Sequence, residues 1–306
     1  MSKIFEALNR RKGETAAWIL PELKEATSEQ LDHATLEDAH GVSEMPQAQN
    51  PETPMLPPAP AGNHPVEAPP SGFQPRTLPL KISGRSPLLP FEANWRAGEE
   101  YRILRTKLVH HPLRPRMILV SSAGPGDGKT VTAVNLAGAL ALRGEAKVLL
   151  MDGDFRRSSL HTLLGLPSGP GLSDVLVGDC SLESALVHTE QLANLYVLTA
   201  GEARMNPVEL LDSAYWLDVC KQLRQLFSYI IVDSPPIGAV ADSELLQSAC
   251  DGVLVVVRPD HSGRASCKRV LETIRKEKLL GVLLNCVEDW FLTRDYRYGY
   301  YGYYGE

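Results

Sequence analysis

The sequence predicts an α/β fold, with a doubly wound, mostly parallel sheet built around a P-loop. Two observations support this fold class. Short and nearly continuous apolar runs alternate with stretches of helical spacing from residue 98 to residue 285, as in strands covered by helices on both faces. A glycine-rich segment also follows the first of these runs and opens a helical stretch, which is the arrangement of a phosphate-binding loop.

Six apolar runs are expected to be strands, at residues 117–122, 147–152, 195–199, 229–233, 252–258 and 280–285. Helical spacing is found at 98–110, in VTAVNLAGALALRG (131–144) and in ADSELLQSA (241–249). Ligands in such sheets bind outside the carboxyl ends of the strands. The residues that follow each apolar run are therefore the candidate site residues.

The parts of the chain outside this pattern have a different composition. Residues 46–90 hold 13 of the 23 prolines and few aromatic residues, and such a composition cannot offset the entropy of folding. We expect a short helical segment at 1–27, which either frays or docks on a partner or membrane surface, and a disordered proline-rich linker at 28–90. The P-loop domain is expected at 91–290 and a flexible tail at 291–306.

Charge and cysteine content exclude several classes of function. The formal net charge is −6, so a nucleic-acid-binding role has no electrostatic support. The five cysteines are widely spaced without a CxxC pair, which argues against disulfides and zinc and for a reducing compartment. No secretory signal and no apolar stretch of about 18 residues is apparent in the sequence. We therefore expect a cytoplasmic protein.

The P-loop candidate is AGPGDGKT (123–130), which meets the pattern GxxxxGK[ST] except that Ala123 replaces the first glycine. Its glycines let the backbone wrap around phosphates, and the N-terminus of the next helix adds partial positive charge. An ordinary glycine-rich turn is the alternative, but the flanking strand and helix favour a nucleotide site. The predicted ATP-binding residues here are Gly124, Pro125, Gly126, Asp127, Gly128, Lys129, Thr130 and Val131.

Carboxylates follow two other expected strands. Asp152 and Asp154 stand at the end of VLLMD (148–152), and Asp233 ends YIIVD (229–233) in the position of a Walker B aspartate. Asp154 could be a helix cap only. Carboxylates, a lysine and a threonine hydroxyl at one sheet edge describe a Mg²⁺–nucleotide site. The predicted metal ligands are Thr130, Asp152 and Asp233.

Taken together, AGPGDGKT, VLLMDGDFRRSSLH (148–161), YIIVDSPP (229–236) and the terminal tyrosines resemble the bacterial tyrosine kinases of capsule and exopolysaccharide systems. The resemblance covers roughly residues 91–306 and includes TAGEARMNPVELL (199–211). Related ATPases that partition chromosomes or place division sites carry a second lysine early in the loop, where this chain has Gly124. Ser158 departs from the family pattern, because a proline is frequent there.

The resemblance implies residue roles. Lys129, Asp152, Asp154 and Asp233 would be catalytic, with Asp152 accepting the proton of the acceptor phenol. Asn285 would contact the adenine base, or else be a turn residue at a strand end. Glu99, Arg102 and Arg105 in EEYRILR (99–105) would make subunit contacts in a ring, the alternative being a solvated helix face. ATP and Mg²⁺ are the expected cofactors.

The last eleven residues, YRYGYYGYYGE, concentrate tyrosines at the end of the chain. The resemblance makes them autophosphorylation sites, and a self-associating Tyr/Gly segment is the alternative. The sites are Tyr296, Tyr298, Tyr300, Tyr301, Tyr303 and Tyr304.

The resemblance also implies partners and a location. The expected partners are a transmembrane polysaccharide chain-length protein that activates the kinase, a cognate tyrosine phosphatase and further copies of the chain, at the inner face of the cell membrane. The competing hypothesis for function is a nucleotide-switched scaffold ATPase of the chromosome-partitioning or division-site type.

Overall fold

The computed structural model describes residues 73–81, 95–142, 144, 146–202 and 206–287. All of these residues belong to one compact unit. The expected N-terminal helical segment (1–27), most of the expected linker (28–90) and the tyrosine tail (291–306) lie outside the described residues.

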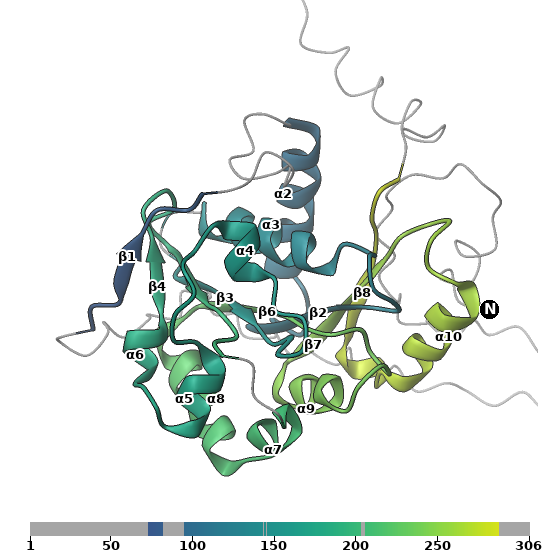
Figure 1. Ribbon diagram of the computed structural model, residues 1–306. Coiled ribbons are helices and arrows are strands. Elements are labelled where there is room, and N and C mark those ends of the chain that lie inside the picture. Colours follow the sequence, from purple (N-terminus) through teal and green to yellow (C-terminus); the bar gives the residue numbers. More distant parts are fainter. Residues whose placement is uncertain (1–72, 82–94, 143, 145, 203–205, 288–306) are drawn as a thin grey trace, which may run out of the picture. The chain divides into compact units, whose positions relative to one another are not determined.

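The unit is built on an eight-stranded sheet (Figure 1), and every strand pair is parallel except β4 with β5. The six expected strands are present, each within one residue of its expected ends. The predicted mostly parallel, doubly wound sheet is therefore confirmed. In sheet order the strands are β1 (Arg76–Leu78), β4 (Val187–Thr189), β5 (Leu195–Leu198), β3 (Val148–Asp152), β6 (Tyr229–Asp233), β2 (Met117–Ser122), β7 (Gly252–Val257) and β8 (Leu279–Leu284).

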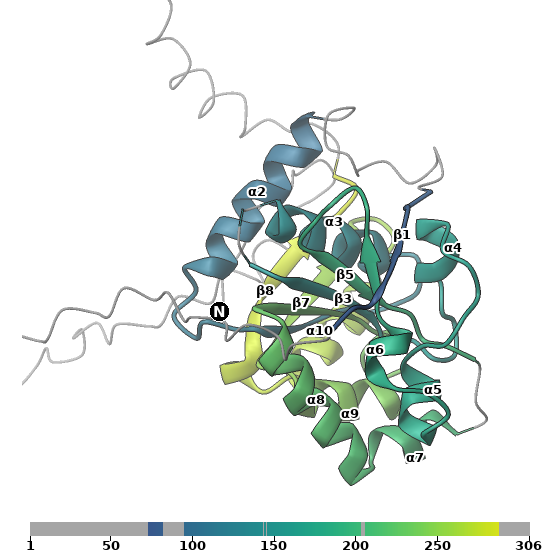
Figure 2. The same ribbon diagram turned by 90° about the vertical axis from the view of Figure 1, so that its left-hand side faces the viewer.

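Helices cover both faces of the sheet, as Figures 1 and 2 show from two directions. One face carries α2 (Trp95–Val109), α3 (Lys129–Ala141) and α4 (Leu160–Leu164). The other face carries α5 (Leu172–Val177), α6 (Leu182–Ala185), α7 (Pro207–Leu211), α8 (Ala214–Leu226), α9 (Asp242–Ala249) and α10 (Arg264–Thr273). A short 3₁₀ helix, η2 (Lys276–Lys278), leads into β8.

Strand β2 shows why the apolar runs are continuous. Its alternate residues Met117 and Leu119 belong to the core under α5–α10, whereas Ile118 and Val120 belong to the core under α2–α4. Successive side chains of a strand point to opposite faces, so a strand with helices on both faces needs apolar residues at every position. The two cores fix the sheet between the helical layers and leave its carboxyl edge for a site.

Strands β1 and β4 were not expected from the sequence. β1 lies inside the proline-rich range, yet it pairs in parallel with β4, and the Lys81 N–H donates to the Leu164 carbonyl 2.9 Å away. The linker expected at 28–90 is therefore wrong for residues 76–78. Three residues between prolines are too few to show a period-2 pattern, and the pairing that makes them a strand comes from a distant part of the chain.

Asp251 joins the amino-terminal edge of the sheet to α8. Its carboxylate accepts the backbone N–H groups of Arg116 and Met117, at 2.8 and 2.7 Å. The guanidinium of Arg224 on α8 donates to both of its oxygens, at 3.0 and 2.9 Å. Burial by itself would raise the pKa of this carboxyl, but the bonds from Arg224 and the two N–H groups lower it below its ordinary value.

We expect Asp251→Asn to lower the free energy of unfolding at pH 7 by about 1–3 kcal/mol, because it leaves charged and backbone donors poorly paired. A carboxyl with a lowered folded-state pKa stabilises above its unfolded pKa of 3.8 and loses that contribution as pH falls through the folded value. The difference from wild type should therefore shrink below pH ~4. Urea unfolding at pH 7, 5 and 3 measures it.

Asp218→Asn is the matched control, because Asp218 lies on α8, the helix that carries Arg224, but forms an exposed pair with Lys221. Such pairs contribute about 0–1 kcal/mol. An equal loss from both substitutions, or a loss from Asp251→Asn that persists at pH 3, would contradict this account.

Candidate functional site

The P-loop connects β2 to α3, and Lys129 and Thr130 are the first two residues of α3. Gly128 precedes them with φ 91°, a backbone conformation that favours glycine. No acidic residue stands in the first turn of α3, so its N-terminal N–H groups remain suited to an anion. This part of the site matches the position expected for a bound triphosphate.

Asp127 fixes the loop to its surroundings. The buried carboxylate accepts the Gly124 N–H at 3.1 Å and the Ser262 hydroxyl at 2.6 Å, and Nδ1 of His261 lies 3.0 Å from it. His261 and Ser262 belong to the loop between β7 and α10. Asp127 therefore ties the P-loop to the β7–α10 loop through its side chain, and its predicted contact with ATP stays a prediction.

Asn285, which directly follows β8, lies against the same loop. Its Nδ2 donates to the Asp127 carbonyl oxygen at 2.9 Å, and a Cβ on Gly128 would overlap the Asn285 amide. Gly128 is thus required by a close approach as well as by its φ angle. The expected contact of Asn285 with adenine stays a prediction.

The carboxyl edge brings the predicted charged residues together. β3 and β6 pair in register, with Asp152 opposite Asp233. The Nζ of Lys129 lies 3.6 Å from an Asp154 carboxylate oxygen, and both side chains are largely buried. The Lys129 ammonium therefore already faces the carboxylates that follow β3.

Asp152 has a structural role as well as its predicted catalytic one. The carboxyl is fully buried, and its Oδ1 accepts the Asp154 N–H at 3.0 Å. Its Oδ2 accepts the Ser158 hydroxyl at 3.0 Å and the N–H groups of Ser159 and Leu160 at 3.3 Å. Burial raises the pKa of Asp152, and these hydrogen bonds oppose that effect. Asp152 thus holds the start of α4, and Oδ1 is the oxygen with the fewer donors.

Asp233 is the opposite case. Its carboxyl is almost completely buried, and neither oxygen has a hydrogen-bond partner among the described residues. Burial raises the pKa of Asp233 to about 7, although the Lys129 charge and the Thr130 hydroxyl, which lies nearby but outside hydrogen-bonding geometry, oppose the increase. A buried carboxylate without donors is costly, and a bound cation would remove that cost.

The donor set suits Mg²⁺ in the presence of a nucleotide. In the described part of the chain, no group of three His, Cys, Asp or Glu side chains could hold a metal ion. Mg²⁺ at phosphate sites is held by one or two carboxylates together with waters and phosphate oxygens. Asp233 and Thr130 meet that requirement, while Asp152 is largely occupied by the donors of α4.

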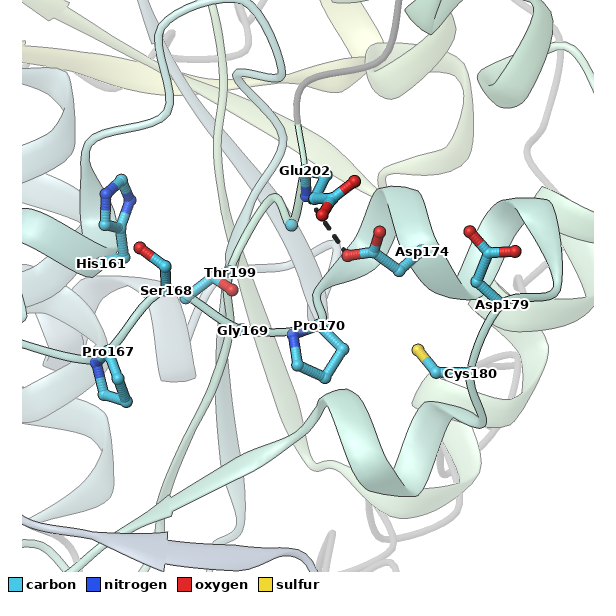
Figure 3. Close-up of a pocket in the computed structure, with 11 residues that line it drawn as sticks. His161, Pro167, Ser168, Gly169, Pro170, Asp174, Asp179, Cys180, Thr199 and Glu202 are labelled. Atoms are coloured by element: carbon cyan, nitrogen blue, oxygen red, sulfur yellow. Dashed lines mark hydrogen bonds between the residues drawn. The ribbon is translucent and has the colours of Figure 1, made fainter.

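A cavity of about 630 Å³ lies beyond the end of β5, where residues of α4 and α5 line it (Figure 3). Figure 3 shows carboxylates gathered on one side of it and His161 and Ser168 on the other. His161 lies 3.4 Å from the Ser158 hydroxyl, which in turn contacts Asp152. The lining residues are His161, Pro167, Ser168, Gly169, Pro170, Asp174, Asp179, Cys180, Thr199, Gly201 and Glu202.

Sequence reasoning missed this cavity. Its walls come from the segment after β3, from the residues after β5 and from the ends of α5, which are adjacent only in the folded chain. The match of TAGEARMNPVELL (199–211) to a family pattern was the one available signal. A smaller cavity of about 340 Å³ lies between the P-loop and the β7–α10 loop.

The EEYRILR residues lie on α2. Glu99 and Arg102 form a half-exposed ion pair at 3.0 Å. The Arg105 guanidinium donates to the Ala139 carbonyl of α3 at 3.3 Å, so this arginine helps to hold α2 on the domain. The expected contacts with a neighbouring subunit stay a prediction.

Among the described residues, no helix has both the length and the apolar character needed to cross a membrane.

Comparison with known proteins identifies the family. Residues 115–280 match the model of an AAA domain. The chain is 37% identical over 210 residues to the tyrosine-protein kinase YwqD of Bacillus subtilis, covering 67% of this chain and 86% of YwqD. This chain belongs to the bacterial tyrosine-protein kinases.

Two further proteins are similar to this chain in sequence or in structure. The tyrosine-protein kinase CpsD of Streptococcus pneumoniae is 33% identical over 213 residues, with 69% of this chain and 91% of CpsD covered. The solved chimerical protein CapA2B2 superposes with a TM-score of 0.61 at 30% identity, over 68% of this chain and 92% of that chain. Within this kinase family, the structure gives Ser158 a contact with Asp152 that a proline could not make.

We expect Ser158→Ala to slow tyrosine phosphorylation about tenfold, because hydrogen bonds that orient a site carboxylate are typically worth 10–100-fold in activity. Ser158→Thr should retain most of the rate. Ser159→Ala is the matched control: the Ser159 backbone N–H, and not its side chain, contacts Asp152. Initial rates of phosphotyrosine formation measure the effect, and equal rates for Ser158→Ala and Ser159→Ala would contradict it.

Asp233→Asn should raise the melting temperature of nucleotide-free, Mg²⁺-free protein at pH 8 and abolish Mg²⁺-dependent nucleotide binding. A raised carboxyl pKa makes ionisation costly: the cost is absent below the unfolded pKa of 3.8 and complete above about 7. The gain should therefore shrink between pH 8 and pH 5. Asp152→Asn should show a smaller gain or none, although the pKa of Asp152 is raised as well, because both of its oxygens accept hydrogen bonds and an amide can replace only one acceptor. A lower melting temperature for Asp233→Asn at pH 8 would refute the argument.

Proposed function

We propose that this protein is an ATP-dependent tyrosine autokinase that phosphorylates its C-terminal tyrosine cluster. The phenol oxygen of a tail tyrosine attacks the γ-phosphorus of ATP, and the bond from that phosphorus to the bridging oxygen of ADP breaks. The phenol proton passes to the carboxylate of Asp152. A carboxylate acceptor is needed because a phenol has a pKa near ~10 and is a poor nucleophile at neutral pH.

One observation carries the proposal: the register of β3 with β6 sets Asp152 opposite Asp233, and Lys129 reaches the same carboxylate cluster from the P-loop. Lys129 and the N–H groups that open α3 would stabilise charge on the transferred phosphoryl group. Thr130 and Asp233 would hold Mg²⁺, which would neutralise charge on the β- and γ-phosphates. Oδ1 of Asp152 has room to accept a proton, since Asp154 N–H is its one bonded donor.

The acceptor tyrosine is proposed to approach from the cavity of about 630 Å³. His161 lines this cavity and contacts the Ser158 hydroxyl, which donates a hydrogen bond to Asp152. The acceptors are Tyr296, Tyr298, Tyr300, Tyr301, Tyr303 and Tyr304. They lie outside the described residues, so their approach is inferred from the site and from the family.

The biological role is proposed from the family. The kinase would regulate the polymerisation and export of a capsule or exopolysaccharide, in the cytoplasm at the inner face of the cell membrane. A transmembrane chain-length protein would activate it, a cognate phosphatase would reverse its reaction, and Glu99, Arg102 and Arg105 would help to join copies of the chain in a ring.

Incubation with γ-labelled ATP and Mg²⁺ tests the reaction. Acid-stable label on the tail tyrosines, lost in a Lys129→Met variant that removes the charge but keeps most of the side-chain volume, would support the kinase. Released phosphate without labelled tyrosine would instead support a nucleotide-switched scaffold ATPase. Labelling that survives in Lys129→Met would remove the P-loop from the mechanism.

Transfer is expected to occur between chains. Mixing Lys129→Met protein that keeps its tail with active protein truncated after Asp295 should place label on the inactive chain, and the rate should rise with the concentration of the active chain. An intramolecular reaction leaves the inactive chain unlabelled, and that result would overturn the prediction. Gel separation of the two chains by size measures it.

A further inference from the structure

Arg156 makes a two-point contact with α9. It follows the aspartates of β3, and its Nε and Nη2 donate to the two oxygens of Asp242 at 2.7 and 3.1 Å. The Asp242 side chain is fully buried at the start of α9, while that of Arg156 is 46% exposed. A bidentate pair of this kind fixes the relative orientation of the guanidinium and the carboxylate as well as their distance. The pair therefore ties the segment after β3 to α9.

The backbone of the same segment rests on β6 and α9. The Gly153 N–H donates to the Asp233 carbonyl at 2.7 Å. A Cβ at Gly153 would lie 2.9 Å from that carbonyl oxygen and 2.9 Å from a Leu246 methyl group on α9. Gly153 therefore has no room for a side chain, because its backbone lies directly against β6 and α9. The Arg156–Asp242 pair is a second attachment of the same segment to α9.

The loop between β6 and α9 is held from the other side. The Ser121 hydroxyl donates to the Pro235 carbonyl at 2.7 Å, and the Ile237 N–H donates to the Ser122 carbonyl at 3.0 Å. β2 thus holds the first half of this loop, and the Arg156–Asp242 pair holds its end. The loop begins at Asp233, so both attachments bear on the position of that carboxylate.

The restraint acts where like charges lie close together. Asp152 lies opposite Asp233 at the ends of two paired strands, and Asp154 follows Asp152 by two residues. Like charges at the ends of two paired strands repel. The positive charge of Arg156 interacts favourably with the carboxylate of Asp154 as well as with that of Asp242. Its charge therefore opposes separation of the strand ends when no cation is bound.

We propose that Arg156 is a positioning residue: through Asp242 it holds the segment after β3 against α9, so that Asp152 and Asp154 stay beside Asp233 in the geometry that Mg²⁺ and nucleotide require. The part of this proposal that concerns catalysis rests on the proposed kinase function. The part that concerns cation-dependent nucleotide binding does not.

The test compares four variants of the full chain: Arg156→Gln, Asp242→Asn, the double variant and Arg157→Gln. Arg157 is the matched control, because it is the next residue, its side chain is exposed, and its backbone N–H bond to Asp154 survives substitution. Binding of a fluorescent ADP analogue is titrated with Mg²⁺, and the melting temperature is measured in parallel.

Arg156→Gln should raise the Mg²⁺ concentration for half-maximal binding about tenfold or more, within the 10–100-fold typical of residues that orient metal ligands, with little change in Mg²⁺-free ADP binding. It should also lower the melting temperature, because it leaves the buried Asp242 carboxylate without its partner. The double variant removes both charges, so it should regain melting temperature and keep the weak Mg²⁺ response. Arg157→Gln should match wild type in both measurements.

A merely stabilising pair gives a different result: the Mg²⁺ response of the double variant would return together with its melting temperature. That outcome, or equal Mg²⁺ responses for Arg156→Gln and Arg157→Gln, would overturn the proposal. If wild-type protein makes no phosphotyrosine, the proposed kinase function fails, while the binding titration still decides the role of Arg156.

Discussion

Parallel pairing of β3 with β6 places Asp152 opposite Asp233 at an edge where both carboxyl groups are buried. Ionised carboxylates in such surroundings repel one another and have lost most of their hydration. The neighbouring structure compensates for this in different ways at the two positions. Asp152 receives four donors, whereas Asp233 receives none from the described residues and has its pKa raised to about 7. One carboxylate is fixed, and the other is left for a ligand.

The positive groups around this edge are attached to different elements. Lys129 comes from α3 and faces Asp154, while Arg156 comes from the segment after β3 and faces Asp242 on α9. Binding of a triphosphate would give Lys129 a new partner without disturbing Arg156. The Lys129–Asp154 pair can therefore be replaced by a contact between Lys129 and phosphate, while the Arg156–Asp242 pair stays in place. The second pair would keep the geometry of the carboxylates during phosphoryl transfer.

The P-loop is also held by contacts with the segments that follow two neighbouring strands, β7 and β8. Asp127 ties the P-loop to the β7–α10 loop through His261 and Ser262, and Asn285 lies on the backbone of the P-loop. A change in the backbone of the P-loop would therefore bear directly on both contacts.

The sequence was sufficient to predict the strands β2, β3 and β5–β8, because apolar runs and helical spacing are local patterns set by burial on two faces. It also placed Lys129, Asp152 and Asp233 at one edge, since parallel strands end on the same side. The folded structure was needed to show that the Asp152 carboxylate accepts hydrogen bonds and that of Asp233 does not, that Arg156 pairs with Asp242, and that residues 76–78 form a strand. These features depend on which distant groups come within hydrogen-bonding distance, and local sequence carries no information about such distances.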